Sequence, residues 1–244
     1  MDPIILPDTS LCAIVRDEKI NPAGGIERFI DSHVPYVEQA VIADTGSVDG
    51  TREILEEMQA KYSNLKVVDI PFKGYADARN KSLKYVQTKR ALILDADELL
   101  THEKPQNDWK ILKEFIEHNQ SRAYRFFFEV IKPERIISPC IGGHTLRLFD
   151  KNPRFSFENK LWEQLKIGKT IGQIWVNGVC IKHFVPSYSS VKLKWKNWYL
   201  DSFSGTKGGE ISDEEQLEYW KIPPSRREGF AKWKRFNPKR DNYI

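Results

Sequence analysis

The chain has 244 residues, of which 40% are hydrophobic, and a formal net charge of +4. That length suits one large domain or one domain with an appendage, and the small charge makes no case for nucleic acid by itself. Three widely spaced cysteines exclude a disulfide framework and a zinc-type spacing, so we expect free thiols in a reducing cytosol. We also expect no secretory signal and no membrane span, and therefore a cytoplasmic protein.

Strand and helix patterns alternate through the first hundred residues. Apolar residues at helical spacing predict one helix over Ala23–Ser32, a second that Asp49 or Thr51 would cap, and a third over Tyr75–Val86. Short apolar runs predict strands at Leu11–Val15, Val37–Asp44, Leu65–Ile70 and Arg90–Asp95. This alternation predicts a parallel, doubly wound α/β unit.

Polar residues follow the ends of the predicted strands. They are Arg16, Glu18, Asp44, Asp95 and Asp97. The carboxyl ends of parallel strands meet at one edge of a sheet, where ligands bind in open α/β folds. In an extended chain, Asp95 and Asp97 would project to the same side. Two close carboxylates repel, so a cation or a ligand hydroxyl is expected between them.

The pattern changes after residue 100. We predict a helix at Asp108–Asn119, followed by strands at Ala123–Ile131, Thr145–Phe149 and Trp175–Phe184 that form an antiparallel or mixed arrangement. The expected division is a domain at 1–186, with a nucleotide half at about 1–100 and an acceptor half at about 101–186. Residues 187–244 are expected to form a basic, aromatic-rich helical extension.

Four motifs in this order resemble the family-two glycosyltransferases. They are Leu11–Glu18, Val41–Thr51, Ala78–Asn80 and Leu92–Glu98. The resemblance covers roughly Leu11 to Phe184. It implies the GT-A fold, with a Rossmann-like, mostly parallel central sheet, helices on both faces and a mixed-strand acceptor region. Within the family, Arg147-Leu148-Phe149 and Trp162–Leu165 look most like bacterial lipopolysaccharide-core type sugar transferases, although many relatives have His where this chain has Trp162.

The resemblance implies a donor site for a nucleoside-diphosphate sugar, most often a UDP-sugar in this family. Asp97 would bind Mn²⁺ or Mg²⁺, which offsets the charge of the leaving diphosphate. Asp95 would bind the ribose or a metal-bound water, and Asp44 would accept a hydrogen bond from the base. His183 is expected as a third metal ligand or a donor to the diphosphate. Other nucleotide-sugar-binding candidates are Arg16, Glu18, Arg79 and Asn80.

An acceptor hydroxyl needs a base aimed at it. Glu163 is the first candidate for that base, and Asp150, which follows a strand, is the second. A single in-line displacement, as the resemblance implies, would invert the sugar. Other acceptor-side candidates are His144, Arg147 and Trp162. The expected acceptor is a glycan or a lipid-linked glycan.

Three other functions are compatible with parts of the pattern. A nucleotidyltransferase would share the acidic edge, but no glycine-rich basic loop follows the first predicted strand. A binding module that has lost turnover would fit the missing His before Glu163. A glycosyltransferase acting on nucleic acid would use Lys221–Arg240, where eight Lys or Arg residues stand against one Glu. A solvated basic face or contact with an anionic membrane explains that segment better.

Overall fold

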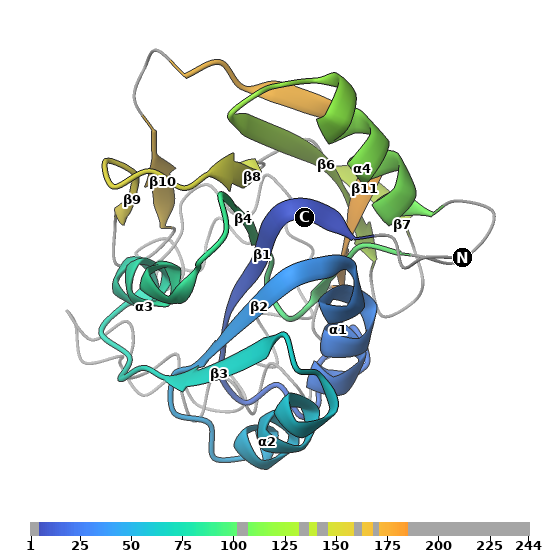
Figure 1. Cartoon of the computed structure of the whole chain (residues 1–244). Helices are drawn as coiled ribbons and strands as arrows, with labels where there is room; N and C mark the ends of the chain where they lie inside the picture. The colour runs from blue at the N-terminus through green and yellow to red at the C-terminus, as the bar shows by residue number, and fades with distance from the viewer. Residues whose placement is uncertain are drawn as a thin grey trace, which may run out of the picture.

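A single mixed sheet organises the described part of the chain. The computed structural model describes residues 5–101, 107–131, 137–140, 146–158, 163–167 and 171–184. Within these residues, nine strands form one sheet in the order β3-β2-β1-β4-β8-β6-β11-β5, with β7 paired to β6 (Figure 1). The strands are β1 Leu6–Val15, β2 Val37–Asp44, β3 Leu65–Asp69, β4 Arg90–Ile93, β5 Glu98–Leu99, β6 Ala123–Ile131, β7 Ile137–Cys140, β8 Leu146–Asp150 and β11 Ile174–Phe184. A separate hairpin pairs β9 (Ser156–Glu158) with β10 (Gln164–Lys166).

The first half of the sheet is parallel, as the sequence predicts. Strand β1 pairs in parallel with β2 and β4, and β2 pairs in parallel with β3. Leu11 and Ala13 face one core and Cys12 faces the other, and all three are fully buried. Because both faces are covered, the second half of the strand, Leu11–Val15, is a continuous apolar run rather than an alternating one.

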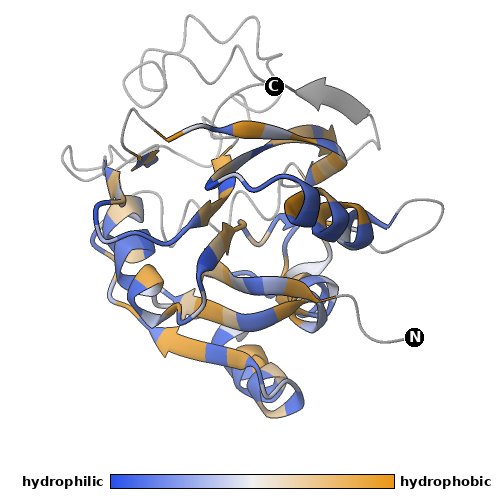
Figure 2. Cartoon of the chain, turned by 45° about the horizontal axis from the view of Figure 1, so that its top comes forward, coloured by the Kyte–Doolittle hydropathy of each residue, from blue (hydrophilic) through white to orange (hydrophobic). Residues whose placement is uncertain are grey.

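Helices cover both faces of this half. The helices are α1 (Gly25–His33), α2 (Thr51–Lys61), α3 (Tyr75–Ser82) and α4 (Asp108–His118), with 3₁₀ turns at Val34–Tyr36 and Leu83–Tyr85. Apolar side chains of α1, α2 and α4 belong to the larger core, whereas the turn after α3 contributes Leu83 to the smaller one. Figure 2 shows the hydrophobic residues concentrated on the strands between these layers.

The second half of the sheet is mixed, as expected. Strand β8 is antiparallel to β4 and β6, β6 is parallel to β11, and β11 is antiparallel to β5. The short strand β5 lies directly after Asp97 in the sequence and pairs with the end of β11, so that Glu98 lies opposite His183. The end of the parallel half of the sheet therefore joins the end of the mixed half.

Several predicted boundaries differ from the structure. Strand β1 begins at Leu6 rather than Leu11, and α3 ends at Ser82, where the chain tightens into a 3₁₀ turn. Strand β4 ends at Ile93, so the predicted extended conformation through Asp95 is wrong, and residues 96–97 form a turn. In that turn the Glu98 N–H donates to the Asp95 carbonyl at 2.9 Å.

No helix in the described ranges is long and apolar enough to cross a membrane. The predicted helical extension at 187–244 lies outside the described residues.

Candidate active site

The loops after β1 and β2 are bonded to each other around Asp44. The hydroxyl of Ser47 donates to Asp44 Oδ1 at 2.6 Å, and the Ser47 N–H donates to the same oxygen at 3.1 Å. The Asp17 N–H donates to the Ser47 hydroxyl at 3.0 Å, and the Val48 N–H donates to Asp17 Oδ1 at 2.8 Å. Asp44 is therefore held in place at the carboxyl end of β2.

Asp17 is a site residue that the sequence reasoning missed. It is 1% exposed, and its backbone has a φ of +54°. Asp and Asn adopt this left-handed conformation more readily than other residues with a side chain, which is the one sequence signal available. Burial raises the pKa of Asp17, against the hydrogen bond from Val48.

The neighbouring candidates Arg16 and Glu18 belong to the same pair of loops. The Thr51 hydroxyl oxygen accepts from the Glu18 and Lys19 N–H groups, both at 2.8 Å. Glu18 is 7% exposed. Arg16 Nε lies 4.0 Å from Asp17 Oδ2. The loop after β1 is thus bonded to the start of α2.

A buried arginine lies at the centre of the acidic edge. Arg79 on α3 has a side chain that is only 2% exposed, and its Nη2 donates to Asp95 Oδ1. Its Nε donates to Glu163 Oε1 at 3.3 Å. From β8, Arg147 Nη2 donates to Asp95 Oδ2 at 3.3 Å and to Glu98 Oε1. Burial favours the neutral form of Asp95, but Arg79 and Arg147 outweigh it and hold the Asp95 pKa well below its usual range.

Like Asp17, Glu98 has no role predicted from the sequence. It is fully buried, and its Oε2 accepts from the Asp95 N–H at 3.0 Å. Its Oε1 lies 3.7 Å from His183 Nδ1. Burial raises the pKa of Glu98, and the charge of Arg147, whose guanidinium donates to Oε1, opposes that shift and favours the carboxylate.

Asp97 differs from these ion-paired carboxylates. It is half-buried, its carbonyl accepts from the Phe184 N–H at 2.9 Å, and no hydrogen bond or ion pair joins its side chain to any described residue. Asp95 and Asp97 flank the buried Ala96, so both retain access to the surface.

The described residues fit a metal ion that arrives with its substrate. Among them, no three His, Cys, Asp or Glu side chains are grouped as a ready metal site. Mg²⁺ in nucleotide enzymes is commonly held by one or two carboxylates together with substrate phosphates. Asp97 offers such a carboxylate, whereas both oxygens of Asp95 already accept from guanidinium groups.

Other predicted residues have structural partners or lie elsewhere. Asn80 forms two hydrogen bonds with the backbone of Phe157, at 2.9 and 2.8 Å, and so joins α3 to β9. Asp150 lies opposite Arg90 at the amino end of β4, 3.5 Å from its Nε, and therefore at the other edge of the sheet. His144 and Trp162 lie outside the described residues.

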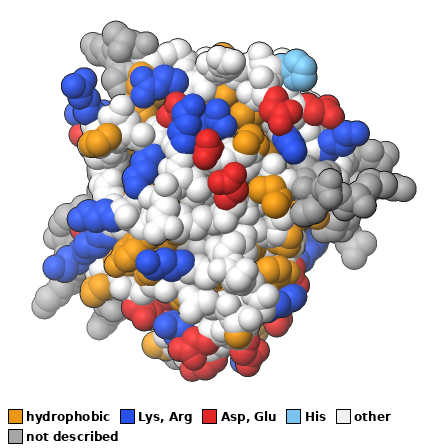
Figure 3. Space-filling model, in the orientation of Figure 1, with side chains coloured by type: hydrophobic (Ala, Val, Ile, Leu, Met, Phe, Trp, Pro, Cys, Tyr) orange, Lys and Arg blue, Asp and Glu red, His pale blue; other side chains and the backbone are white. Residues whose placement is uncertain are grey.

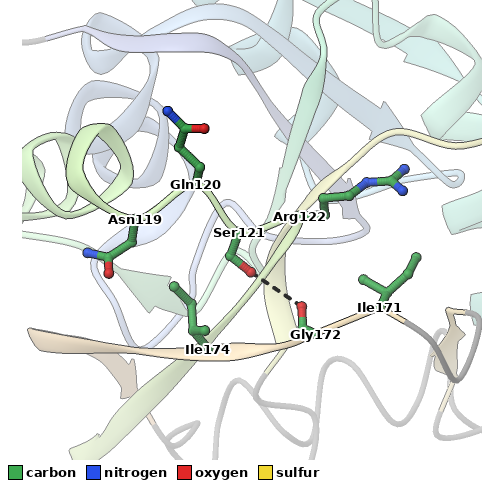
Figure 4. Close-up of a pocket in the computed structure, with 7 residues that line it drawn as sticks. All are labelled: Asn119, Gln120, Ser121, Arg122, Ile171, Gly172 and Ile174. Carbon is green, nitrogen blue, oxygen red and sulfur yellow. Dashed lines mark hydrogen bonds between the residues drawn. The ribbon is translucent and has the colours of Figure 1, made fainter.

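A cavity of about 480 Å³ also lies at that other edge. It is lined by residues 119–122 and by Ile171, Gly172 and Ile174, and the Ser121 hydroxyl donates to the Gly172 carbonyl across it at 3.3 Å (Figure 4). It adjoins the start of β6, where Ala123 pairs with Phe149. The cavity is thus separate from the ion pairs that Arg79 forms with Asp95 and Glu163.

Comparisons with known proteins give one family match and several structural neighbours with a similar fold. Residues 21–135 match the model of Glycosyl transferase family 2. No curated protein matches the chain. Among solved structures, Staphylococcus aureus TarS 1–349 in complex with UDP-GlcNAc aligns with a TM-score of 0.56 at 14% identity, over 91% of this chain and 75% of that one. The mannosyltransferase PcManGT from Pyrobaculum calidifontis, in complex with GDP-Man and Mn²⁺, aligns with a TM-score of 0.55 at 16% identity, over 84% and 65%.

Proposed function

We propose that this chain moves a sugar from a UDP-sugar to a hydroxyl of a glycan or lipid-linked acceptor, because residues 21–135 match the Glycosyl transferase family 2 model and the fold is similar to that of TarS. One observation carries the proposal. The Asp44 loop follows the carboxyl end of β2 and the turn with Asp97 follows that of β4, while Arg79 on α3 joins Asp95 at this edge to Glu163. Uridine is chosen because TarS structures contain UDP and UDP-GlcNAc, while GDP-Man in the second neighbour makes guanosine the alternative.

We assign the donor to the edge between Asp44 and Asp97. Asp44 accepts a hydrogen bond from the base, since its Oδ2 has only a 3.3 Å contact with the Ser47 N–H. Asp97 holds Mn²⁺ or Mg²⁺ together with the diphosphate. When bound, that cation offsets the negative charge that develops on the leaving diphosphate. His183 lies beside this turn and is assigned to the cation or the diphosphate.

Glu163 is assigned as the base for the acceptor hydroxyl. Its Oε1 accepts from Arg79, which leaves Oε2 without a partner among the described residues. Removal of the hydroxyl proton by Glu163 during one in-line attack would form the new glycosidic bond as the bond to the diphosphate breaks. Such a displacement inverts the configuration of the sugar.

A nucleic acid acceptor is not favoured. On the face seen in Figure 3, Lys and Arg side chains are interspersed with Asp and Glu, and acidic side chains gather over α2. Glu53, Glu56 and Glu57 are exposed on that helix. Nucleic-acid-binding surfaces instead concentrate positive charge. We assign the basic segment at 221–240, outside the described residues, to peripheral contact with an anionic membrane on its cytoplasmic side.

A thermal-shift screen of UDP, GDP, UDP-GlcNAc and GDP-Man, each with and without Mn²⁺, tests the donor. We expect a Mn²⁺-dependent rise in melting temperature with UDP and UDP-GlcNAc, because a ligand that binds only the folded state stabilises it. Release of UDP in the presence of acceptors then tests transfer. Binding without release across a panel of glycans would indicate a binding module, and release of pyrophosphate would indicate a nucleotidyltransferase.

A further inference from the structure

We propose that Glu98 is a positioning residue of the donor site, which fixes the turn that carries Asp97 and orients the imidazole of His183. The inference rests on the proposed function, since it gives Glu98 the task of holding groups that meet the donor diphosphate and its cation. Glu98 itself does not touch the donor, because its side chain is fully buried.

The first argument is that two hydrogen bonds join Glu98 to Asp95 across the turn. Its N–H donates to the Asp95 carbonyl at 2.9 Å, and its side-chain Oε2 accepts from the Asp95 N–H at 3.0 Å. The two residues between them, Ala96 and Asp97, are therefore held between reciprocal bonds. The Phe184 N–H, which donates to the Asp97 carbonyl at 2.9 Å, fastens the same turn to β11.

The second argument is the free-energy cost of burying the Glu98 carboxylate and the Arg147 guanidinium. The Glu98 carboxylate is buried against Arg147, whose guanidinium also lies 5.3 Å from the centre of the Phe128 ring. Apolar residues can often replace a buried ion pair without loss of stability. Stability alone therefore gives little reason for a buried carboxylate here, whereas a turn that must present Asp97 in one geometry does.

The third argument concerns His183. Strand pairing places His183 opposite Glu98, and its Nδ1 lies 3.7 Å from Glu98 Oε1. A carboxylate beside one ring nitrogen favours the proton on that nitrogen and leaves the lone pair of neutral histidine on the other. Nε2 is then the nitrogen available to a ligand, and 36% of the His183 side chain is exposed. Glu98 thus acts on two groups of the site at once.

The test is Glu98→Gln, with Glu57→Gln on the exposed face of α2 as the matched control. Glutamine keeps the size of the side chain and an acceptor for the Asp95 N–H, but it removes the charge that faces Arg147 and His183. Loss of such a supporting partner typically weakens metal affinity by about 10- to 100-fold. We expect that loss in Mn²⁺ affinity at saturating UDP, measured by electron paramagnetic resonance of free Mn²⁺, and no change in the control.

Three further variants, two single and one double, separate positioning from folding. In Glu98→Ala we expect faster hydrogen exchange of the Asp95 amide in the ligand-free protein. In His183→Gln we expect weaker Mn²⁺ binding with that amide still protected, and a double variant with Glu98→Gln should lose less than the two single losses combined. If Glu98→Gln does not fold, His183→Gln carries the test.

Unchanged Mn²⁺ affinity in folded Glu98→Gln, or in His183→Gln, would overturn the inference. Strictly additive losses would also overturn it, because Glu98 would then not act through His183. Failure of the wild-type chain to bind any of the four nucleotides with Mn²⁺ would instead defeat the proposed function itself.

Discussion

Arg79 on α3 donates from Nε to Glu163 Oε1 at 3.3 Å, although 84 positions separate the two residues in the chain. The same guanidinium donates from Nη2 to Asp95. Asp95 follows β4 in the parallel half of the sheet, whereas Glu163 precedes β10 in the separate β9–β10 hairpin. One buried cation therefore joins the turn after β4 to the residue that we propose as the base.

Replacement of this cation tests how much the junction contributes to stability. Arg79→Met should lower the free energy of unfolding by about 3 kcal/mol, because it removes the guanidinium partner of Glu163 and one of the two partners of Asp95. This is the lower end of the usual range, since the Asp95 side chain is 37% exposed. Urea unfolding measures the loss. Arg52→Met is the control, because Arg52 pairs with Asp69 at the surface and should contribute less than about 1 kcal/mol. Equal losses in the two variants would contradict a special role for Arg79.

Replacement of Asp97 should have little effect on stability and a large effect on sugar transfer. Its side chain has no partner among the described residues, so Asp97→Ala should change stability by no more than about 0.5 kcal/mol. Sugar transfer should fall by about 100-fold or more, since the charge stabilisation that a metal supplies is worth several kcal/mol and each 1.36 kcal/mol is a factor of ten. The Mn²⁺-dependent thermal shift with UDP should disappear with it. The same change at Asp31 on α1 should leave both transfer and the shift intact, and persistent transfer in Asp97→Ala would refute the assignment.

The parallel half of the sheet could be predicted from the sequence because its strands and helices follow local patterns of apolar residues. Strands buried on both faces contain continuous apolar runs, as at residues 40–43 of β2, and the helices that connect them make them parallel. Strands of the mixed second half could also be predicted. The apolar and aromatic side chains of β6, Ala123–Ile131, contrast with the polar residues on either side of it in the sequence.

The arrangement of charges could not be predicted in the same way. The same-side rule for Asp95 and Asp97 assumes an extended chain, and the strand ends at Ile93. Glu98 looks locally like an exposed acid, yet its partner Arg147 lies 49 positions away. Such pairs depend on which strands become neighbours, and here β8 inserts between β4 and β6. Local spacing contains no information on that order.

Gly25, the first residue of α1, offers a test of the loop after β1. Its φ is +90°, and a Cβ there would lie 2.9 Å from the Lys19 carbonyl oxygen, which is backbone and cannot easily move. Gly25→Ala should therefore destabilise the fold by about 1–3 kcal/mol. It should also weaken UDP binding, since the next residue, Ile26, donates its N–H to the Glu18 carbonyl at 2.9 Å. Thermal unfolding and UDP titration measure the two effects. Gly172→Ala, whose added Cβ has no heavy atom of a described residue other than its chain neighbours within 4 Å, should change neither.

His33 gives the fold a dependence on pH. It is fully buried on α1, its Nε2 accepts from the Leu100 N–H at 3.1 Å, and Nδ1 therefore carries the proton that is donated to the Phe29 carbonyl at 2.6 Å. A second proton has no acceptor in this arrangement. Burial lowers the pKa of His33 from 6.5 to about 4, against the hydrogen bond to Phe29.

The sign of the effect follows from proton binding. Between pH 6.5 and about 4 the unfolded chain binds a proton at this position and the folded chain does not, so stability is complete above pH 6.5 and is lost as the pH falls. The loss attributable to His33 should reach about 3 kcal/mol, at 1.36 kcal/mol per pKa unit. His33→Gln keeps an acceptor for Leu100 and should unfold in urea with a flatter dependence on pH between 7 and 4. His118→Gln, at an exposed position on α4, should retain the wild-type slope, and an unchanged slope in His33→Gln would show that other groups cause the acid sensitivity.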